Sequence, residues 1–264
     1  MSTLRNQPSV GLTLICVFAI FAIAGCTHEQ NQGHSAEQVY TRPIYSKVLT
    51  YDPALMTDTA SLTVAIQIYD GLVEFDNNFE IQPAIAESWS TSSDGTNLTF
   101  KLRKTAKFHN GSPVTAHDCV ESFKRLLSKR SVVSKYYDLI LGSEEFKRGQ
   151  TKNVEGLIAP DKYTFVMKLK NKFPPFIQVL AGGTAKILPA HLMNEKRFFD
   201  KPVGSGPFRL VFNDDHQIML ERFEHYDRDR PKLSKLIFKV MSESEALQEA
   251  SRGTIQDIVS YPLN

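Results

Sequence analysis

Histidine, acidic and cysteine residues stand side by side at one place, His117-Asp118-Cys119, and His109 lies eight residues earlier. These are the types of side chain that bind zinc. On a helix, three consecutive residues point in directions about 100° apart, so they cannot close on one ion. We therefore expect no metal site here, and we expect Cys119 to be a small buried residue rather than a reactive thiol. His109 is expected to lie in a turn.

A serine hydrolase would need a nucleophile on a tight Gly-x-Ser-x-Gly turn. The sequence has no such spacing, and its nearest approach is Gly204-Ser205-Gly206-Pro207. The proline removes an N–H from the place where an oxyanion hole or a phosphate cradle would need donors. We therefore expect a rigid turn. Phosphate-binding and dinucleotide fingerprints are also missing. The sequence therefore predicts a protein that is not an enzyme, has no catalytic residues and binds no cofactor.

Charged residues are numerous but balanced. Lysine and arginine total 31 and the acidic residues 29 in 264 residues, which gives a formal charge of +2. A chain that binds phosphate backbones usually carries a basic excess, so no nucleic acid is expected as a partner. The clusters Asp214-Asp215-His216 and Asp227-Arg228-Asp229 lack the longer ligand spacing of a calcium loop. They are expected to be solvated charges on loops.

Cysteine chemistry of another kind is expected near the N-terminus. Arg5 precedes the uncharged residues 11–24, which suit a signal-peptide core and are fewer than the roughly 20 residues that span a bilayer. Ile23-Ala24-Gly25-Cys26 then resembles the lipobox of bacterial lipoprotein precursors. The resemblance implies cleavage before Cys26 and a diacylglyceryl group on its thiol, with the lipid bilayer as a partner. The alternative is an ordinary signal peptide that has a cysteine near its end.

The predicted organisation has three parts. Residues 1–25 are a lipoprotein signal peptide, residues 26–42 are a lipidated flexible tether, and residues 43–264 are a folded domain. The tether is expected because the residues after Thr27, up to about residue 38, are polar and lack β-branched and aromatic types. The domain is expected at the periplasmic or extracytoplasmic face of a bacterial membrane. Whether that membrane is inner, outer or single stays open.

Within the domain, strand and helix patterns mix without strict alternation. We therefore expect an α/β fold with a mixed sheet rather than a purely parallel one. Alternating apolar and polar residues predict strands at residues 98–103, 164–169, 218–221 and 236–240. Helices are predicted at residues 61–68, from residue 115 onward, and at residues 242–252. Turn residues predict hairpins at residues 76–78 and 92–95.

The helix expected from Thr115 has the clearest signals. Thr115 and Asp118 have the spacing of a capping box. The apolar residues that follow fall on one face of the helix, namely Ala116, Cys119, Val120, Phe123, Leu126 and Leu127. Cys119 lies in this stripe, which is the reason to expect its burial. Ser242 and Glu245 repeat the capping spacing in the last predicted helix.

Four collinear segments of the domain resemble the large solute-binding proteins of bacterial ABC importers, family 5, which includes oligopeptide-, dipeptide- and nickel-binding proteins. They are Tyr51-Asp52-Pro53 to Gly71-Leu72-Val73, Pro83-Ala84-Ile85 to Thr115-Ala116-His117-Asp118, Asp161-Lys162-Tyr163 to Phe173-Pro174-Pro175-Phe176, and Pro202-Val203-Gly204-Ser205-Gly206-Pro207-Phe208. The second segment is the most specific. The resemblance covers about residues 43–258 and implies a periplasmic-binding-protein-like lobe in which mixed sheets are flanked by helices.

The resemblance also implies a ligand and its contacts. In such proteins two lobes close over an extended ligand, and peptide binders hold the ligand main chain by strand-like hydrogen bonds. Thr57, Asp58, Thr59, Ala60 and Ser61 match the segment that lines the cleft, so they are the expected ligand-binding residues. The alternative is that they cap the next helix, and both can hold. The scaffold alone does not determine whether the ligand is a peptide, a nickel chelate, a sugar or another solute.

The sequence departs from the family in length. Family members are roughly twice as long and carry a second lobe beyond the point where this sequence stops. The resemblance therefore implies the N-terminal part of the binding domain, ending near the interlobe hinge, and leaves open whether the chain is a natural truncation or a fragment. In peptide binders the acidic group that pairs with the ligand's amino terminus lies in the part that is missing here.

These observations lead to one expected function and two alternatives. The first is a monomeric, non-catalytic solute-binding lipoprotein that delivers oligopeptides or dipeptides to ABC permease subunits. The second is a non-transporting lobe that docks a permease or a sensor. The third is a surface hydrolase, which the missing nucleophile motifs disfavour.

Overall fold

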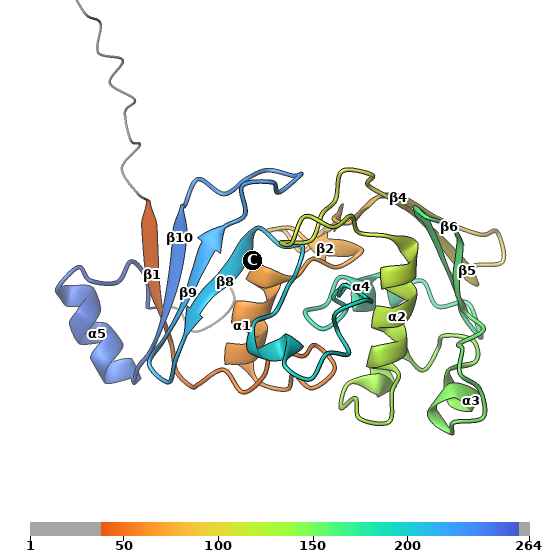
Figure 1. Cartoon of the computed structure of the whole chain (residues 1–264), viewed down its shortest axis with the longest axis horizontal. Helices are drawn as coiled ribbons and strands as arrows, with labels where there is room; N and C mark the ends of the chain where they lie inside the picture. Colours follow the sequence, from red (N-terminus) through yellow and green to blue (C-terminus); the bar gives the residue numbers. More distant parts are fainter. Residues whose placement is uncertain (1–37, 259–264) are drawn as a thin grey trace, which may run out of the picture. The chain divides into compact units, whose positions relative to one another are not determined.

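The computed structural model describes residues 38–258. The predicted signal peptide, Cys26 and most of the predicted tether lie outside the described residues, as do residues 259–264. The described part is a mixed α/β fold with two four-stranded sheets and one two-stranded sheet (Figure 1). This confirms the predicted fold class. No helix within residues 38–258 has the length and apolar character needed to cross a membrane.

One four-stranded sheet brings together the two ends of the described chain. Its order is β1-β10-β9-β8, built from β1 (Val39–Ile44), β8 (Phe208–Asn213), β9 (Gln217–Arg222) and β10 (Lys235–Val240). Strand β1 runs parallel to β10, and the other neighbours are antiparallel. The predicted tether of residues 26–42 is therefore too long by its last four residues, which are paired in the sheet. Their partner strand lies near the other end of the chain, so no local pattern reveals the pairing.

The second four-stranded sheet is antiparallel throughout. Its order is β4-β5-β7-β6, built from β4 (Ala86–Thr91), β5 (Asn97–Leu102), β6 (Leu157–Asp161) and β7 (Thr164–Lys168). The short strands β2 (Val73–Phe75) and β3 (Ile81–Pro83) form the hairpin. All four predicted strands are confirmed to within one or two residues at their ends. Both predicted hairpin turns are confirmed as the β2–β3 and β4–β5 connections.

In the described part of the chain, five α-helices lie between and after the strands. They are α1 (Thr59–Ile68), α2 (Ala116–Leu126), α3 (Ser143–Lys147), α4 (Phe176–Leu180) and α5 (Glu243–Ser251), with single 3₁₀ turns at Ser134–Tyr137 and Phe198–Asp200. The capping boxes predicted for α2 and α5 are both present. Cys119 is fully buried in the apolar face of α2, and this burial raises the pKa of its thiol. The prediction of a buried cysteine is confirmed.

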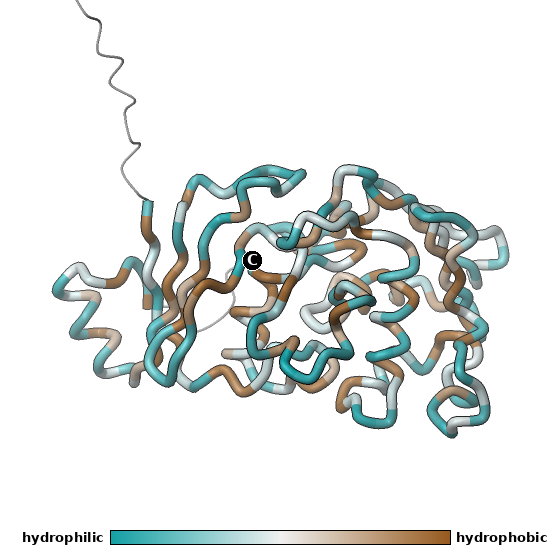
Figure 2. Tube along the Cα trace, viewed as in Figure 1, coloured by the Kyte–Doolittle hydropathy of each residue, from teal (hydrophilic) through white to brown (hydrophobic). Residues whose placement is uncertain are grey.

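Two apolar clusters form the interior. The first lies between α2 and the sheet of β5 and β7, where the Phe123 and Phe165 rings stack with centroids 5.9 Å apart. The second surrounds α1 and the sheet of β8, β9 and β10, with Ile68 and Phe238 at its centre. Hydrophobic and hydrophilic residues alternate along these strands, whereas the outer helix α5 is mostly hydrophilic (Figure 2). Val203 contacts both clusters, so the segment around it lies where they meet.

Candidate functional site

The five predicted ligand-binding residues form the beginning of α1. Asp58 is the N-cap, and its carboxylate accepts a hydrogen bond of 2.8 Å from the Ser61 amide. Ala60 and Ser61 are buried, and the Ser61 hydroxyl accepts from the amides of Leu49 and Thr50, so these two residues have structural roles. Thr57 and Thr59 are exposed. The capping role therefore holds for Asp58, while ligand contact at this segment stays a prediction.

The opposite end of α1 is held by a close backbone approach. The residues 204–207, predicted as a rigid turn, bend at Gly206-Pro207, and residues 204–206 are buried. The Gly206 amide donates to the Ile68 carbonyl at 2.9 Å. A Cβ on Gly204 would lie 1.9 Å from that carbonyl oxygen, and a Cβ on Gly206 would lie 2.7 Å from the Gln67 oxygen. The glycines are therefore required by close packing, because no side chain fits between the two backbones.

His109 fastens this segment to the loop before α2. It lies in a turn, as predicted, and its amide donates to the Gly204 carbonyl at 2.8 Å. The ring accepts at Nδ1 from the Gly204 amide (3.2 Å), which leaves Nε2 to donate to the Gly206 carbonyl (3.0 Å). This arrangement needs the neutral imidazole with its proton on Nε2. Burial lowers the pKa of His109 to about 4.

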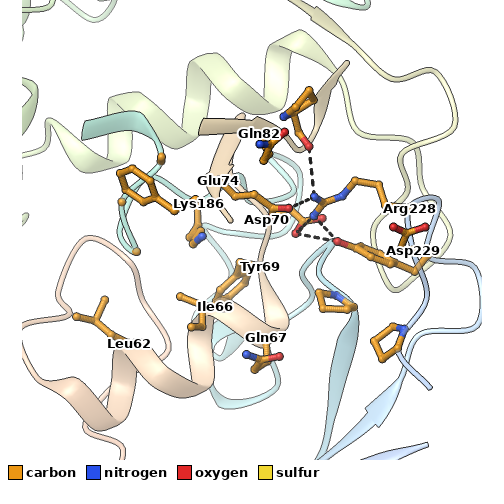
Figure 3. A pocket seen from close by; sticks show the side chains of 18 of the residues that line it. Leu62, Ile66, Gln67, Tyr69, Asp70, Glu74, Gln82, Lys186, Arg228 and Asp229 are labelled. Carbon is orange, nitrogen blue, oxygen red and sulfur yellow. Dashed lines mark hydrogen bonds and ion pairs between the residues drawn. The ribbon is translucent and has the colours of Figure 1, made fainter. Parts of the chain in front are cut away.

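A cavity of about 880 Å³ opens beside the C-terminal half of α1 (Figure 3). Its wall comes from α1, the β2–β3 hairpin, the residues after α4 and the loop between β9 and β10. A cavity of this volume is in the range of small-molecule sites. The predicted contact residues 57–61 do not belong to its described lining. The cavity is thus a second candidate site on the same helix.

Charged residues meet at one part of the cavity wall. Arg228 donates to Asp70 Oδ1 at 2.7 Å, and it also donates to Glu74 and to the Tyr226 hydroxyl. The Tyr226 hydroxyl in turn donates to Asp70 at 3.3 Å, and the guanidinium of Arg228 lies over the Tyr226 ring. Figure 3 shows Asp70, Glu74 and Arg228 converging. Asp70 and Arg228 therefore join the segment after α1 to the loop between β9 and β10.

The expectation that Asp227-Arg228-Asp229 is a solvated cluster is wrong for Arg228. Its side chain is 14% exposed, whereas its sequence neighbour Asp229 is exposed. Its partners, Asp70 and Glu74, lie more than 150 residues earlier. A triplet of charges in a loop is usually solvated, and only the tertiary fold shows that the central one turns inward.

Burial alters the acid–base behaviour of two groups in the wall. Burial raises the pKa of Asp70 to about 7, against the opposing influence of Arg228. Burial also lowers the pKa of Lys186, which lines the same cavity. Both shifts have the sign expected when a charged form is removed from water. Perturbed pKa values beside a cavity are typical of functional sites.

Two residues of the His117-Asp118-Cys119 triplet, Asp118 and Cys119, are buried, whereas His117 is exposed. Asp118 completes the capping box with Thr115, and its other oxygen accepts from the Ala190 amide at 2.9 Å. Across residues 38–258 no three histidine, cysteine or acidic side chains are grouped so that they could hold a metal ion.

Comparison with known proteins places the chain in a family. Residues 80–264 match the family model of the bacterial extracellular solute-binding proteins, family 5. The dipeptide-binding protein DppE of Bacillus subtilis is 30% identical over 247 residues, which is 84% of this chain and 44% of the relative. The periplasmic oligopeptide-binding protein OppA of Haemophilus influenzae is 31% identical over 230 residues, which is 81% of this chain and 42% of the relative.

Solved structures of similar fold support the same family assignment. The crystal structure of Haemophilus influenzae OppA in complex with the peptide RPPGFSPFR matches with a TM-score of 0.79 and 27% identity, covering 83% of this chain and 45% of that one. An oligopeptide transporter component from Bacillus anthracis matches with a TM-score of 0.78 and 27% identity, covering 84% and 45%. The chain spans somewhat less than half the length of these proteins. It belongs to the bacterial extracellular solute-binding proteins of family 5.

Proposed function

We propose that this chain is a lipid-anchored solute-binding protein that binds oligopeptides or dipeptides outside the cytoplasmic membrane and delivers them to an ABC permease. The observation that carries the proposal is the likeness of the lobe, in fold and sequence, to proteins named for binding dipeptides and oligopeptides. The exposed hydroxyls of Thr57 and Thr59 at the start of α1 support ligand contact at that segment. In this proposal the protein carries its solute unchanged.

Peptide binding is tested by calorimetric titration of the full chain, extracted from membranes in mild detergent, with mixed tri- to pentapeptides. We expect saturable binding that weakens in the variants Thr57→Val and Thr59→Val, because valine keeps the shape and removes the hydroxyl. Thr91→Val, at an exposed threonine in β4, is the matched control and should bind as the parent does. Equal binding by all four proteins would remove Thr57 and Thr59 from the site.

The lipid anchor is tested separately. Cells that express the chain are labelled with radioactive palmitate, and we expect label on the wild type and on Cys119→Ser but not on Cys26→Ser. Cys119 is the matched control because it is a buried thiol in the domain. Release of the Cys26→Ser chain from the membrane fraction would support anchoring through that residue, since acyl chains supply the membrane affinity. Label that persists in Cys26→Ser would contradict it.

A second candidate is a lobe that docks a permease or a sensor without carrying solute. The chain spans less than half the length of these relatives. The intact mass of the protein from its own cells separates the candidates. A lipidated species near the mass of residues 26–264 that binds no peptide, yet is captured with a permease in the absence of ligand, favours docking. A species of about twice that mass favours the peptide-importer proposal.

A further inference from the structure

The cavity beside α1 contains a buried cation that no described residue pairs. Lys186 is 6% exposed and lines the cavity together with Asp70 and Glu74 (Figure 3). Its ammonium has three hydrogens to donate. Within residues 38–258, however, this ammonium has no hydrogen-bond acceptor and no ion-pair partner. Because a buried charge without a partner is costly, the cavity favours a ligand that brings an acceptor to Lys186.

Two arginines of the wall add donors that are not used. Nε of Arg228 is buried and has no hydrogen-bond partner, although the two Nη groups of the same guanidinium donate to Asp70 and Glu74. Nε of Arg103 donates to the Ala84 carbonyl at 2.8 Å, and its Nη groups have no partner among the described residues. Unused donors therefore come from all three cations that line the cavity, which indicates an anion site.

Three acids also line the cavity, and each is compensated in its own way. Glu74 is paired with Arg228, and Asp229 is exposed, so that water and salt screen its charge. Burial raises the pKa of Asp70, so this carboxyl takes up a proton more readily than a solvated one. With Asp70 protonated, the lining has three cations and two anions, a formal charge of +1. One bound anion brings this charge to zero.

Charged and titratable groups from three elements face Asp70. They are Glu74 of β2, Lys186 after α4, and Tyr226, Asp227 and Arg228 of the loop between β9 and β10. The two cations among them lower the pKa of Asp70, and the two acids raise it. An anion bound at Lys186 would act in the same direction as these acids. Anion binding and protonation of Asp70 should therefore favour each other.

The rest of the wall is suited to an apolar ligand body. Apolar residues from four segments line it, namely Leu62, Ile66, Phe75, Pro83, Pro207 and Pro231. The volume of about 880 Å³ is far larger than an inorganic anion needs. We propose that this cavity binds a monocarboxylate with an apolar body, its carboxylate on Lys186 and its body against these residues. The site is separate from residues 57–61 and goes beyond the proposed peptide binding.

The test is calorimetric titration of the full chain, extracted in mild detergent, with hexanoate, hexanamide and hexylamine. The three probes share one apolar chain and differ in charge. We expect hexanoate to bind at least about tenfold more tightly than hexanamide, because the amide loses the charge-assisted contact with Lys186. Equal binding of these two would mean that the cavity is selective only for the apolar chain. Tighter binding of hexylamine would mean that the acids dominate, and either result would overturn the inference.

Variants assign the binding to this cavity. Lys186→Met should abolish the preference for hexanoate over hexanamide, and Lys186→Gln is the second variant in case the first fails to fold. Lys152→Met, at an exposed lysine, should keep the preference of the parent. All proteins are titrated in the same detergent, so partition of the probes into micelles cancels. A preference that survives both Lys186 variants, or no saturable binding of hexanoate up to about 10 mM, would overturn the inference.

Two further titrations examine the acids of the wall. Hexanoate is ionised at pH 6 and at pH 8, and we expect tighter binding at pH 6, where more of Asp70 is protonated. Asp70→Asn should remove this pH dependence, and a dependence that persists in it would refute the role of Asp70. L-leucine separates the proposed site from one that takes an amino acid. Binding of leucine that is tighter than that of hexanoate would mean that the acids hold its ammonium, and would overturn the inference.

Discussion

His109 offers a test of how the two apolar clusters are joined. Its ring must be neutral to accept from the Gly204 amide, because a proton on Nδ1 would face another N–H. Burial lowers the pKa of the ring to about 4, and the neighbouring charge of Arg209 acts in the same direction. Between pH 4 and 6.5 the unfolded chain therefore binds a proton at this residue that the folded chain does not, so stability must fall as the pH is lowered.

The magnitude follows from the two pKa values. The difference between the ordinary value of 6.5 and the folded value of about 4 corresponds to about 3 kcal/mol of unfolding free energy. The contribution is fully present above pH 6.5 and absent below pH 4. Replacement by asparagine keeps an acceptor near the Nδ1 position and cannot be protonated. We expect His109→Asn to cost about 1 kcal/mol at pH 7 for the lost hydrogen bond to Gly206, and to be more stable than the parent near pH 4.

Urea unfolding measures this difference. The fluorescence of Trp89, the single tryptophan, reports unfolding at pH 4, 5, 6 and 7. The quantity that tests the argument is the stability of the parent minus that of His109→Asn, because other titrating groups cancel in it. His191→Asn, at an exposed histidine, should show no such trend. A difference that stays constant within about 0.5 kcal/mol from pH 4 to 7 would refute the claim that the fold requires a neutral His109.

Three further predictions use the same unfolding assay. Gly206→Ala should lower the unfolding free energy by about 3 kcal/mol or more, because the new Cβ would lie 2.7 Å from a backbone oxygen. The control Gly111→Ala should cost about 1 kcal/mol, because there is open space around Gly111 but its φ is positive. Burial raises the pKa of Asp70, so the folded carboxyl holds its proton more strongly than the unfolded one, and stability should fall as the pH rises from 4 to 7. The penalty of Asp70→Asn should therefore shrink over this range, and a pH-independent penalty would contradict the shift. Thr115→Ala should cost about 1 kcal/mol through loss of the α2 cap, and no change would mean that Asp118 alone holds the helix start.

Elements with local signals could be predicted from the sequence. The α2 helix has a capping box and an apolar stripe, and strands β5 and β7 alternate regularly, so their positions follow from residues only a few places apart. Strand β1 has no such signal, because it becomes a strand by pairing with β10 near the other end of the chain. Four of its six residues, 39–42, therefore fall within the predicted tether.

The candidate cavity was largely hidden from sequence reasoning. Asp70 and Arg228 form an ion pair although they lie more than 150 residues apart in the sequence, and neither position has a local pattern that predicts burial. Lys186 follows ordinary small residues and would be expected at the surface. The signal that could have raised suspicion is the run of charges around Arg228, but such runs are usually solvated. Only the packing of separate segments turns these three charges toward one space.

The close backbone approach at Gly204 and Gly206 affects both the stability of the fold and the position of Asp70 in the cavity wall. The Gly206 amide holds the carbonyl of Ile68, which is two residues before Asp70. Pro207, the next residue of the same segment, lines the cavity. A side chain inserted at Gly206 would push the end of α1 away, and Asp70 would move with it relative to Arg228. Substitutions at this position should therefore disturb the Asp70–Arg228 ion pair as well as stability, whereas a lost helix cap at Thr115, on a helix of the other apolar cluster, should change stability alone.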